Sequence, residues 1–398
     1  MNKNKPAIRF KGFYDAWEQR KLGEIVGIYD GVHQTPNYQD SGIMFLSVEN
    51  IVSLKSSKFI SEEDFKRDYK VYPQKNDILM TRIGDVGTTN VVTDNGLKAY
   101  YVSLALLKYK NTEPYFLSNA IQSNFVQTGL ANRTLKTAIP MKINKDEIGK
   151  VDVMLPLSSD EQEKIGTFFR KLDNLITLHQ RKYEKLQNVK KSMLEKMFPK
   201  NGSKIPEIRF KGFTDAWEQR EFGELYVRSS EKNDGTIDVG KNITVATMQF
   251  KPDIKVTTKE YLKTYFTFNV GDIAFEGHQS KEFKFGRFVE NDIGNGIVSH
   301  IFAVFRPIKE YDLQFWKYAI NNESLMQSIL SRSTKASTMM HDLVTTDFLR
   351  EKFAVPSLEE QRKIGSFLNG LDNLITLHQR EYEKLQNIKK SMLEKMFV

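Results

Sequence analysis

The chain has 398 residues, of which 40% are hydrophobic and 27% charged, and its net charge of +9 favours a polyanionic partner without proving one. It contains no cysteine, which excludes disulfides, thiolate nucleophiles and cysteine-ligated zinc, and its six histidines show no metal-binding spacing. No apolar run approaches the roughly 20 residues of a membrane span and no signal peptide begins the chain, so we expect a cytoplasmic protein of two or three domains without membrane contact.

Much of the chain occurs twice. The stretch IRFKGFYDAWEQRKLGEI at 8–25 returns at 208–225 with 14 of 18 positions identical, and residues 161–198 return at 360–397 with 31 of 38 identical. The segments between these repeats are nearly equal in length and share almost no letters. Such repetition indicates two halves of one architecture. Each half is a tag, a variable domain and a shared segment.

The variable domain of the first half predicts strands followed by a helix, because runs rich in β-branched and aromatic residues precede a longer apolar-periodic stretch. The predicted strands are 45–54, 77–84, 88–93 and 100–110, and the predicted helix is 115–130.

The shared segment that follows has apolar residues with a period near 3.5, which predicts a long helix packed on another helix. Ser159 and Asp160 are its expected N-terminal caps. The stretch PKNGSKIP that comes next is typical of a linker. The second half repeats the order, with predicted strands 243–250, 270–277, 285–290 and 297–307, a helix at 313–330 and the second long helix.

The sequence thus predicts an α+β fold with two mixed α/β domains of the same plan, each followed by a long helix. We expect the two helices to pack as an antiparallel coiled coil with pseudo-twofold symmetry. A pseudo-symmetric scaffold that carries two different domains suits an asymmetric, two-part DNA sequence. Trp17 and Trp217, in the tags, are expected in the core. The predicted boundaries are 1–158 for the first domain, 159–198 for the central helix, 199–207 for the linker, 208–357 for the second domain and 358–398 for the C-terminal helix.

The tag IRFKGFxDAWEQRxxGE, the block PLSSDEQEKIGTFFRKLDNLITLHQRKYEKLQNVKKSMLEKMF and the order of the two halves resemble the specificity subunit of type I restriction–modification systems. The resemblance implies two target-recognition domains that each read one half of a bipartite site in double-stranded DNA, with the helices setting the spacing. It also implies that the repeats dock two methyltransferase (modification) subunits and, through them, restriction subunits.

By the same resemblance the chain itself is non-catalytic and holds no cofactor. S-adenosylmethionine, ATP and magnesium are expected in the partner subunits, whose complex resembles an ATP-dependent endonuclease and adenine-N6 methyltransferase. The GxxxxGK spacing at 235–241 is a weak match to a phosphate-binding loop, because Asn242 replaces the hydroxyl residue that would hold magnesium.

Two other functions remain open, a coiled-coil scaffold that does not read DNA and a stand-alone nuclease or methyltransferase. The divergence of the two variable domains argues against the scaffold. The missing cofactor and metal motifs argue against the enzyme.

Candidate DNA contacts are polar and basic side chains on predicted loops, because base edges and phosphates bind such groups. The loop after the predicted helix is the strongest candidate in each half, and the tags and exposed helix faces are the expected partner surface. The candidates are Gln34, Thr35, Tyr38, Asn50, Arg82, Arg133, Thr134, Lys136 and Thr137 in the first half, and His278, Gln279, Ser280, Lys281, Arg332, Ser333, Thr334, Lys335 and Ser337 in the second.

Overall fold

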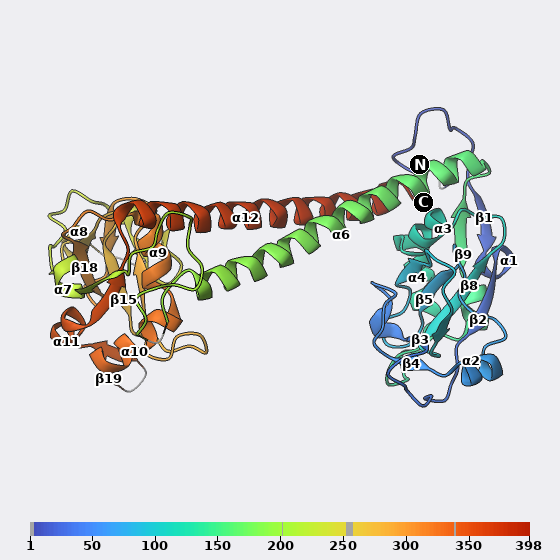
Figure 1. Ribbon diagram of the computed structural model, residues 1–398. Coiled ribbons are helices and arrows are strands. Elements are labelled where there is room, and N and C mark those ends of the chain that lie inside the picture. The colour runs from blue at the N-terminus through green and yellow to red at the C-terminus, as the bar shows by residue number, and fades with distance from the viewer. Residues whose placement is uncertain (1–3, 201, 252–257, 338–339) are drawn as a thin grey trace. The chain divides into compact units, whose positions relative to one another are not determined.

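The chain forms two compact units in a computed structural model that describes residues 4–200, 202–251, 258–337 and 340–398 (Figure 1). The first unit is Met1–Gln180 with Gln379–Val398, and the second is Arg181–His378. The long helices α6 (Ser159–Lys196) and α12 (Leu358–Lys395) each contribute one part to either unit.

The first unit is built on a four-stranded antiparallel sheet of order β2-β8-β5-β6, beside a three-stranded sheet of order β4-β3-β7. A separate ribbon pairs β1 of the tag with β9. The strands are β1 (Glu18–Lys21), β2 (Val26–Asp30), β3 (Ile43–Leu46), β4 (Phe59–Ile60), β5 (Ile78–Thr81), β6 (Thr89–Val91), β7 (Lys98–Tyr100), β8 (Leu104–Tyr109) and β9 (Asp152–Leu155). The helices are α1 (Leu22–Ile25), α2 (Glu62–Asp68), α3 (Pro114–Ile121), α4 (Asn124–Arg133), α5 (Lys145–Gly149) and the 3-10 helix η1 (Val48–Asn50).

The second unit repeats this plan around a four-stranded sheet of order β11-β18-β15-β16 and a ribbon of β10 with β21. Its strands are β10 (Glu218–Glu221), β11 (Tyr226–Ser229), β12 (Ile243–Thr244), β13 (Gln249–Phe250), β14 (Phe266–Phe268), β15 (Ile273–Glu276), β16 (Arg287–Glu290), β17 (Gly296–Val298), β18 (Ala303–Pro307), β19 (Thr334–Ala336), β20 (His341–Leu343) and β21 (Lys352–Val355). Its helices are α7 (Phe222–Leu225), α8 (Lys259–Leu262), α9 (Leu313–Ile320), α10 (Glu323–Ser333), α11 (Thr345–Arg350) and the 3-10 helix η2 (Val239–Lys241).

The repeated sequence forms the same packing arrangement in both units, in which the tag packs against the first turn of a long helix. We call this arrangement the seat. In the first, the Arg9 guanidinium binds the buried Glu161 carboxylate through two hydrogen bonds of 2.6 and 2.8 Å. In the second, Arg209 binds Glu360 in the same way, at 2.8 and 2.7 Å. These pairs fix each tag to the first turn of a long helix.

Each seat also receives the last residues of the other half's helix. Met396 and Phe397 belong to the first core, where the Phe397 ring lies 6.1 Å from that of Trp17. Met197 and Phe198 belong to the second core, where Phe198 lies 6.0 Å from Trp217. Both tryptophans are buried, which confirms their prediction as core residues. The near-identity of the repeats follows, since each helix end must fit the same kind of seat.

The long helices also contact each other inside each unit. An ion pair of 2.7 Å joins Lys389 to Asp173 in the first unit, and one of 2.6 Å joins Lys190 to Asp372 in the second. In the first unit the Phe169 ring also lies 5.6 Å from the Phe397 ring, so residue numbers fall along the C-terminal segment as they rise on α6, and the two segments there run antiparallel.

Six predicted elements differ from the structure. The strands at 100–110 and 297–307 are each two strands, β7 with β8 and β17 with β18, that lie in different sheets. The strand at 45–54 ends at Leu46, because the Ser47 amide donates to the Asn50 side chain and a 3-10 turn begins. The helix at 115–130 is two helices, since the backbone of Ser123 is extended. The helix at 313–330 is broken in the same place, where the Asn322 side chain caps α10. The strand at 243–250 is a hairpin of β12 and β13.

Candidate nucleic-acid interface

Two loops predicted to contact DNA lie side by side in the first unit. The loop after β5 and the loop after α4 are joined by backbone hydrogen bonds, from the Gly84 amide to the Met141 carbonyl (2.8 Å) and from the Ile143 amide to the Arg82 carbonyl (3.0 Å). An isolated bridge pairs Ile83 with Lys142. Segments more than 50 residues apart in the sequence therefore form one surface.

The second unit joins the corresponding loops. The His341 amide donates to the Gly277 carbonyl (2.8 Å), and a bridge pairs His278 with Met340. The loop after α10 continues into the hairpin of β19 and β20. The paired loops are thus a shared feature of two domains whose residues differ.

Most of the predicted loop side chains are exposed. In the first unit Lys136 and Thr137 reach solvent from the loop after α4. In the second unit the exposed candidates on the paired loops are His278, Gln279, Ser280, Lys281, Lys335 and Ser337, whereas Arg332 is exposed on the last turn of α10 and not on the loop. These groups can donate to phosphates and base edges.

Two predicted contacts are buried, and the structure corrects their roles. Arg82 is 5% exposed, and its guanidinium binds the Asp30 carboxylate and donates to the Ile143 carbonyl. Burial lowers the pKa of this guanidinium. Ser333 is fully buried and its hydroxyl donates to the Ile329 carbonyl. Arg82 therefore holds the two loops together, and neither side chain is placed to reach a base.

Four candidates are engaged locally, and two of them, Arg133 and Arg332, lie in the last turns of helices α4 and α10 and not on the predicted loops. Arg133 forms an ion pair with Glu147 (3.1 Å), and Arg332 forms one with Glu351 (2.5 Å) whose hydrogen bond raises the pKa of the arginine. The hydroxyls of Thr134 and Thr334 donate to carbonyls one turn back in their helices, Leu130 and Leu330. A DNA contact by either arginine would require it to exchange a carboxylate for a phosphate or base.

The remaining first-half candidates lie on other segments. Gln34, Thr35 and Tyr38 are exposed on the loop after β2, where the Tyr38 ring contacts Phe45 and the Lys58 ammonium. Asn50 is half-buried and its amide donates to the Lys55 carbonyl (2.9 Å), which stabilises a turn.

The structure adds residues to the candidate surface that the sequence analysis missed. Lys142 and Lys145 are exposed beside Lys136, and Ile139 stands at the tip of the same loop with 99% of its surface exposed. The sequence did contain a signal for these lysines, because residues 132–145 contain four basic residues and no acidic one.

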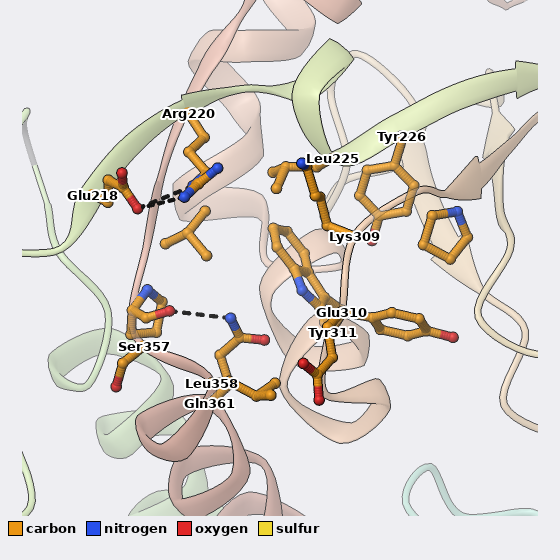
Figure 2. Close-up of a pocket in the computed structure, with 14 residues that line it drawn as sticks. Glu218, Arg220, Leu225, Tyr226, Lys309, Glu310, Tyr311, Ser357, Leu358 and Gln361 are labelled. Carbon is orange, nitrogen blue, oxygen red and sulfur yellow. Dashed lines mark hydrogen bonds and ion pairs between the residues drawn. The ribbon is translucent and has the colours of Figure 1, made fainter.

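A cavity of about 360 Å³ lies elsewhere in the second unit (Figure 2). The tag strand β10 and the start of α12 form part of its wall, with Arg220 paired to Glu218 and the Gln361 amide donating to the Pro356 carbonyl. None of its lining residues belongs to the paired loops.

The long helices expose the same apolar pair in both units. Leu175 and Leu178 of α6, in the first unit, are 45% and 46% exposed, and Leu374 and Leu377 of α12, in the second, are 45% and 51% exposed. Both pairs belong to the repeated stretch LDNLITLHQR. The chain thus exposes the same apolar pair twice, once in each unit.

Comparison with known proteins assigns the class. A family model described as the type I restriction modification DNA specificity domain matches residues 14–188 and again 214–387. The chain therefore belongs to this family and carries two copies of its domain. This confirms the resemblance found in the sequence, so the chain is a specificity subunit with two target-recognition domains, and not a catalytic subunit.

Individual relatives agree with the family. A type I restriction enzyme MjaVIII specificity subunit of Methanocaldococcus jannaschii is 22% identical over 401 residues, which cover 95% of this chain and 91% of that protein. The crystal structure of a type I restriction–modification S subunit from M. genitalium has a TM-score of 0.66 at 14% identity and covers 99% of both chains, which shows the shared fold. Among the helices of the described residues, none has the length and apolar character needed to cross a membrane.

Proposed function

We propose that each target-recognition domain reads one half of an asymmetric bipartite site in double-stranded DNA through its paired loops. The observation that carries the proposal is the joining of the loop after β5 to the loop after α4, and of their counterparts in the second unit, into one exposed polar surface each. Different residues on the same frame would read different bases.

The charge of these loops supports contact with phosphates. Lys136, Lys142 and Lys145 form no ion pair with any residue of the described ranges, and Lys281 and Lys335 form none there either. Each lysine that neutralises a phosphate releases counterions, so binding should depend on salt.

Lysine removal tests this proposal. In the complex with the methyltransferase, Lys136→Ala with Lys142→Ala should weaken binding to a duplex that carries the site. The negative slope of log K against log salt should become shallower by about 0.9 for each phosphate that is no longer neutralised. Lys281→Ala with Lys335→Ala should do the same from the other half-site. Lys66→Ala is the matched control, because Lys66 is paired with Glu62 on α2. An unchanged affinity and slope in both double variants would contradict the proposed surface.

We further propose that the repeated leucine pairs dock two methyltransferase subunits, one on each unit, and that restriction subunits join through them. Each pair lies on its own copy of the repeated ten-residue stretch, and the two pairs are exposed to a similar extent. In the proposed complex the partners, in the cytoplasm, hold S-adenosylmethionine, ATP and magnesium, and methylate adenine at N6. The long helices set the distance between the two recognition domains.

Charge placed on one pair at a time tests the docking. Leu175→Glu with Leu178→Glu should leave one bound methyltransferase, and so should Leu374→Glu with Leu377→Glu, because a carboxylate cannot be buried in an apolar contact without a partner. All four substitutions together should abolish binding, as measured by native mass spectrometry. Ile205→Glu, on the exposed linker, is the control. Two copies bound to the fourfold variant would contradict the docking surface.

A further inference from the structure

The loop after α4 ends in an exposed apolar tip. Ile139 is 99% exposed, and Leu135 and Met141 beside it are 45% and 46% exposed. Removing such side chains from water is favourable, so a surface that displays three of them together is suited to an apolar contact. An exposed methionine, Met340, lies on the corresponding loop of the second unit.

The tip is held in place by the backbone. The Leu135 amide donates to the Lys142 carbonyl (2.8 Å), and the Gly84 amide donates to the Met141 carbonyl (2.8 Å). The chain on either side of Ile139 is therefore tied both to itself and to the neighbouring loop. A contact made by this side chain would order little additional backbone.

The surroundings of the tip identify a polyanion as its occupant. Lys136, Lys142 and Lys145 are exposed before and after it in the chain, and no acidic residue occurs between residues 132 and 145. An apolar tip flanked by cations along the chain matches the major groove of DNA, where the 5-methyl group of thymine is the apolar feature among polar base edges and phosphates flank the groove.

We propose that Ile139 contacts the 5-methyl group of a thymine in the major groove of the first half-site and so helps to determine specificity there. Leu135 and Met141 flank this contact, while the lysines bind phosphates on either side. The inference rests on the proposed function, in which an adenine-methylating partner requires an A·T pair, and therefore a thymine methyl group, in the half-site.

The test combines a protein variant with a DNA analogue in the complex of this chain and its methyltransferase. Ile139→Ala should weaken binding to the specific duplex by at least about fivefold, because the substitution removes three side-chain carbons, of which contact with a single methyl group buries only a part. Replacing the contacted thymine by deoxyuridine removes only the methyl group and should weaken wild-type binding about fourfold. The same replacement should have no effect on the Ile139→Ala complex, and Ile139→Leu should restore most of the affinity.

Matched controls separate the contact from folding. Ile301→Ala removes an equally apolar side chain, 73% exposed, from a turn outside the paired loops of the second unit and should leave the first half-site unaffected. If Ile139→Ala binds like the wild type, the inference is wrong. It is also wrong if deoxyuridine weakens both complexes equally, or if Ile139→Ala weakens binding and no thymine replacement does, which would indicate a wedge between base pairs. Absence of specific binding by the wild-type complex would instead overturn the proposed function.

Discussion

Val91 of the first recognition domain and Glu290 of the second occupy equivalent positions, but the first side chain is apolar and the second is an ionisable acid. Val91 pairs with Ile78 in the first sheet, and Glu290 pairs with Ile273 in the second. Glu290 is 3% exposed, and both of its carboxylate oxygens lack a hydrogen-bond partner among the described residues. Burial raises the pKa of this carboxyl well above its ordinary value, opposed by Lys317 and reinforced by Asp292 and Asp312. The second domain therefore carries a polar group that its core does not satisfy.

Replacing this glutamate should stabilise the second domain. Glu290→Val should slow hydrogen exchange in β15 and β16 at pH 7, by an amount that corresponds to roughly 1–3 kcal/mol, because an unsatisfied buried group is removed. The folded-state pKa is raised, so the folded protein retains a proton that the unfolded chain loses above about pH 4.3, and wild-type stability falls as pH rises from there. The gain from Glu290→Val should therefore shrink toward pH 4.

The reciprocal change gives the control. Val91→Glu in the first domain should speed exchange in β5 and β6, while leaving β15 and β16 unchanged. Glu290→Gln should remove the pH dependence and retain the unsatisfied polar group. Faster exchange of β15 and β16 in Glu290→Val at pH 7 would show that the carboxylate is satisfied in solution, contrary to this prediction.

At the scale of elements, the long helices and the order of strands could be predicted from the sequence because hydrophobic periodicity acts locally. The central helix, predicted at 159–198, is observed as Ser159–Lys196. The predicted strand at 100–110 could not be resolved into β7 and β8, because β7 pairs in parallel with β3 in a different sheet. Pairing between distant segments is not encoded in local periodicity.

In the candidate interface, too, local features could be predicted from the sequence and contacts between distant residues could not. The exposed loops could be identified from the sequence because their polar and basic residues are local features. The burial of Arg82 could not, since Asp30, its partner, lies 52 residues away. Nor could the exposure of Ile139, because an isoleucine in a sequence is more often a core residue. Burial depends on which loops meet, and that is a property of the folded domain.

The antiparallel helices allow a test of spacing at this scale. The ion pair of Lys190 with Asp372 places Gln187 opposite Ile375. Inserting four residues at both points adds about one turn and about 6 Å to the paired helices, and the proposed function predicts a gap longer by about two base pairs. Insertion of two residues at both points rotates the packed face by about 200° and should prevent assembly. A methylated motif with an unchanged gap in the four-residue variant would mean that the helices do not set the spacing.

At the scale of the whole molecule, one sequence is used twice for structure, whereas recognition uses two different sequences on one plan. The repeated tag and helix make two equivalent seats, one with the ion pair of Arg9 and Glu161 and one with that of Arg209 and Glu360. The sequence of the seats is repeated because each of them must also accept the helix end of the other half. The variable domains keep the strand order and the paired loops, and change the side chains that those loops display. The division explains why identity is high in the scaffold and nearly absent between the recognition domains.

A map of N6-methyladenine across the genome of a host that expresses this chain together with a methyltransferase subunit would test the proposed function directly. We expect a two-part asymmetric motif, with half-sites centred about one helical turn apart, that appears only when this chain is present. Methylation that appears without the chain, or that lacks a bipartite pattern in its presence, would show that specificity lies elsewhere.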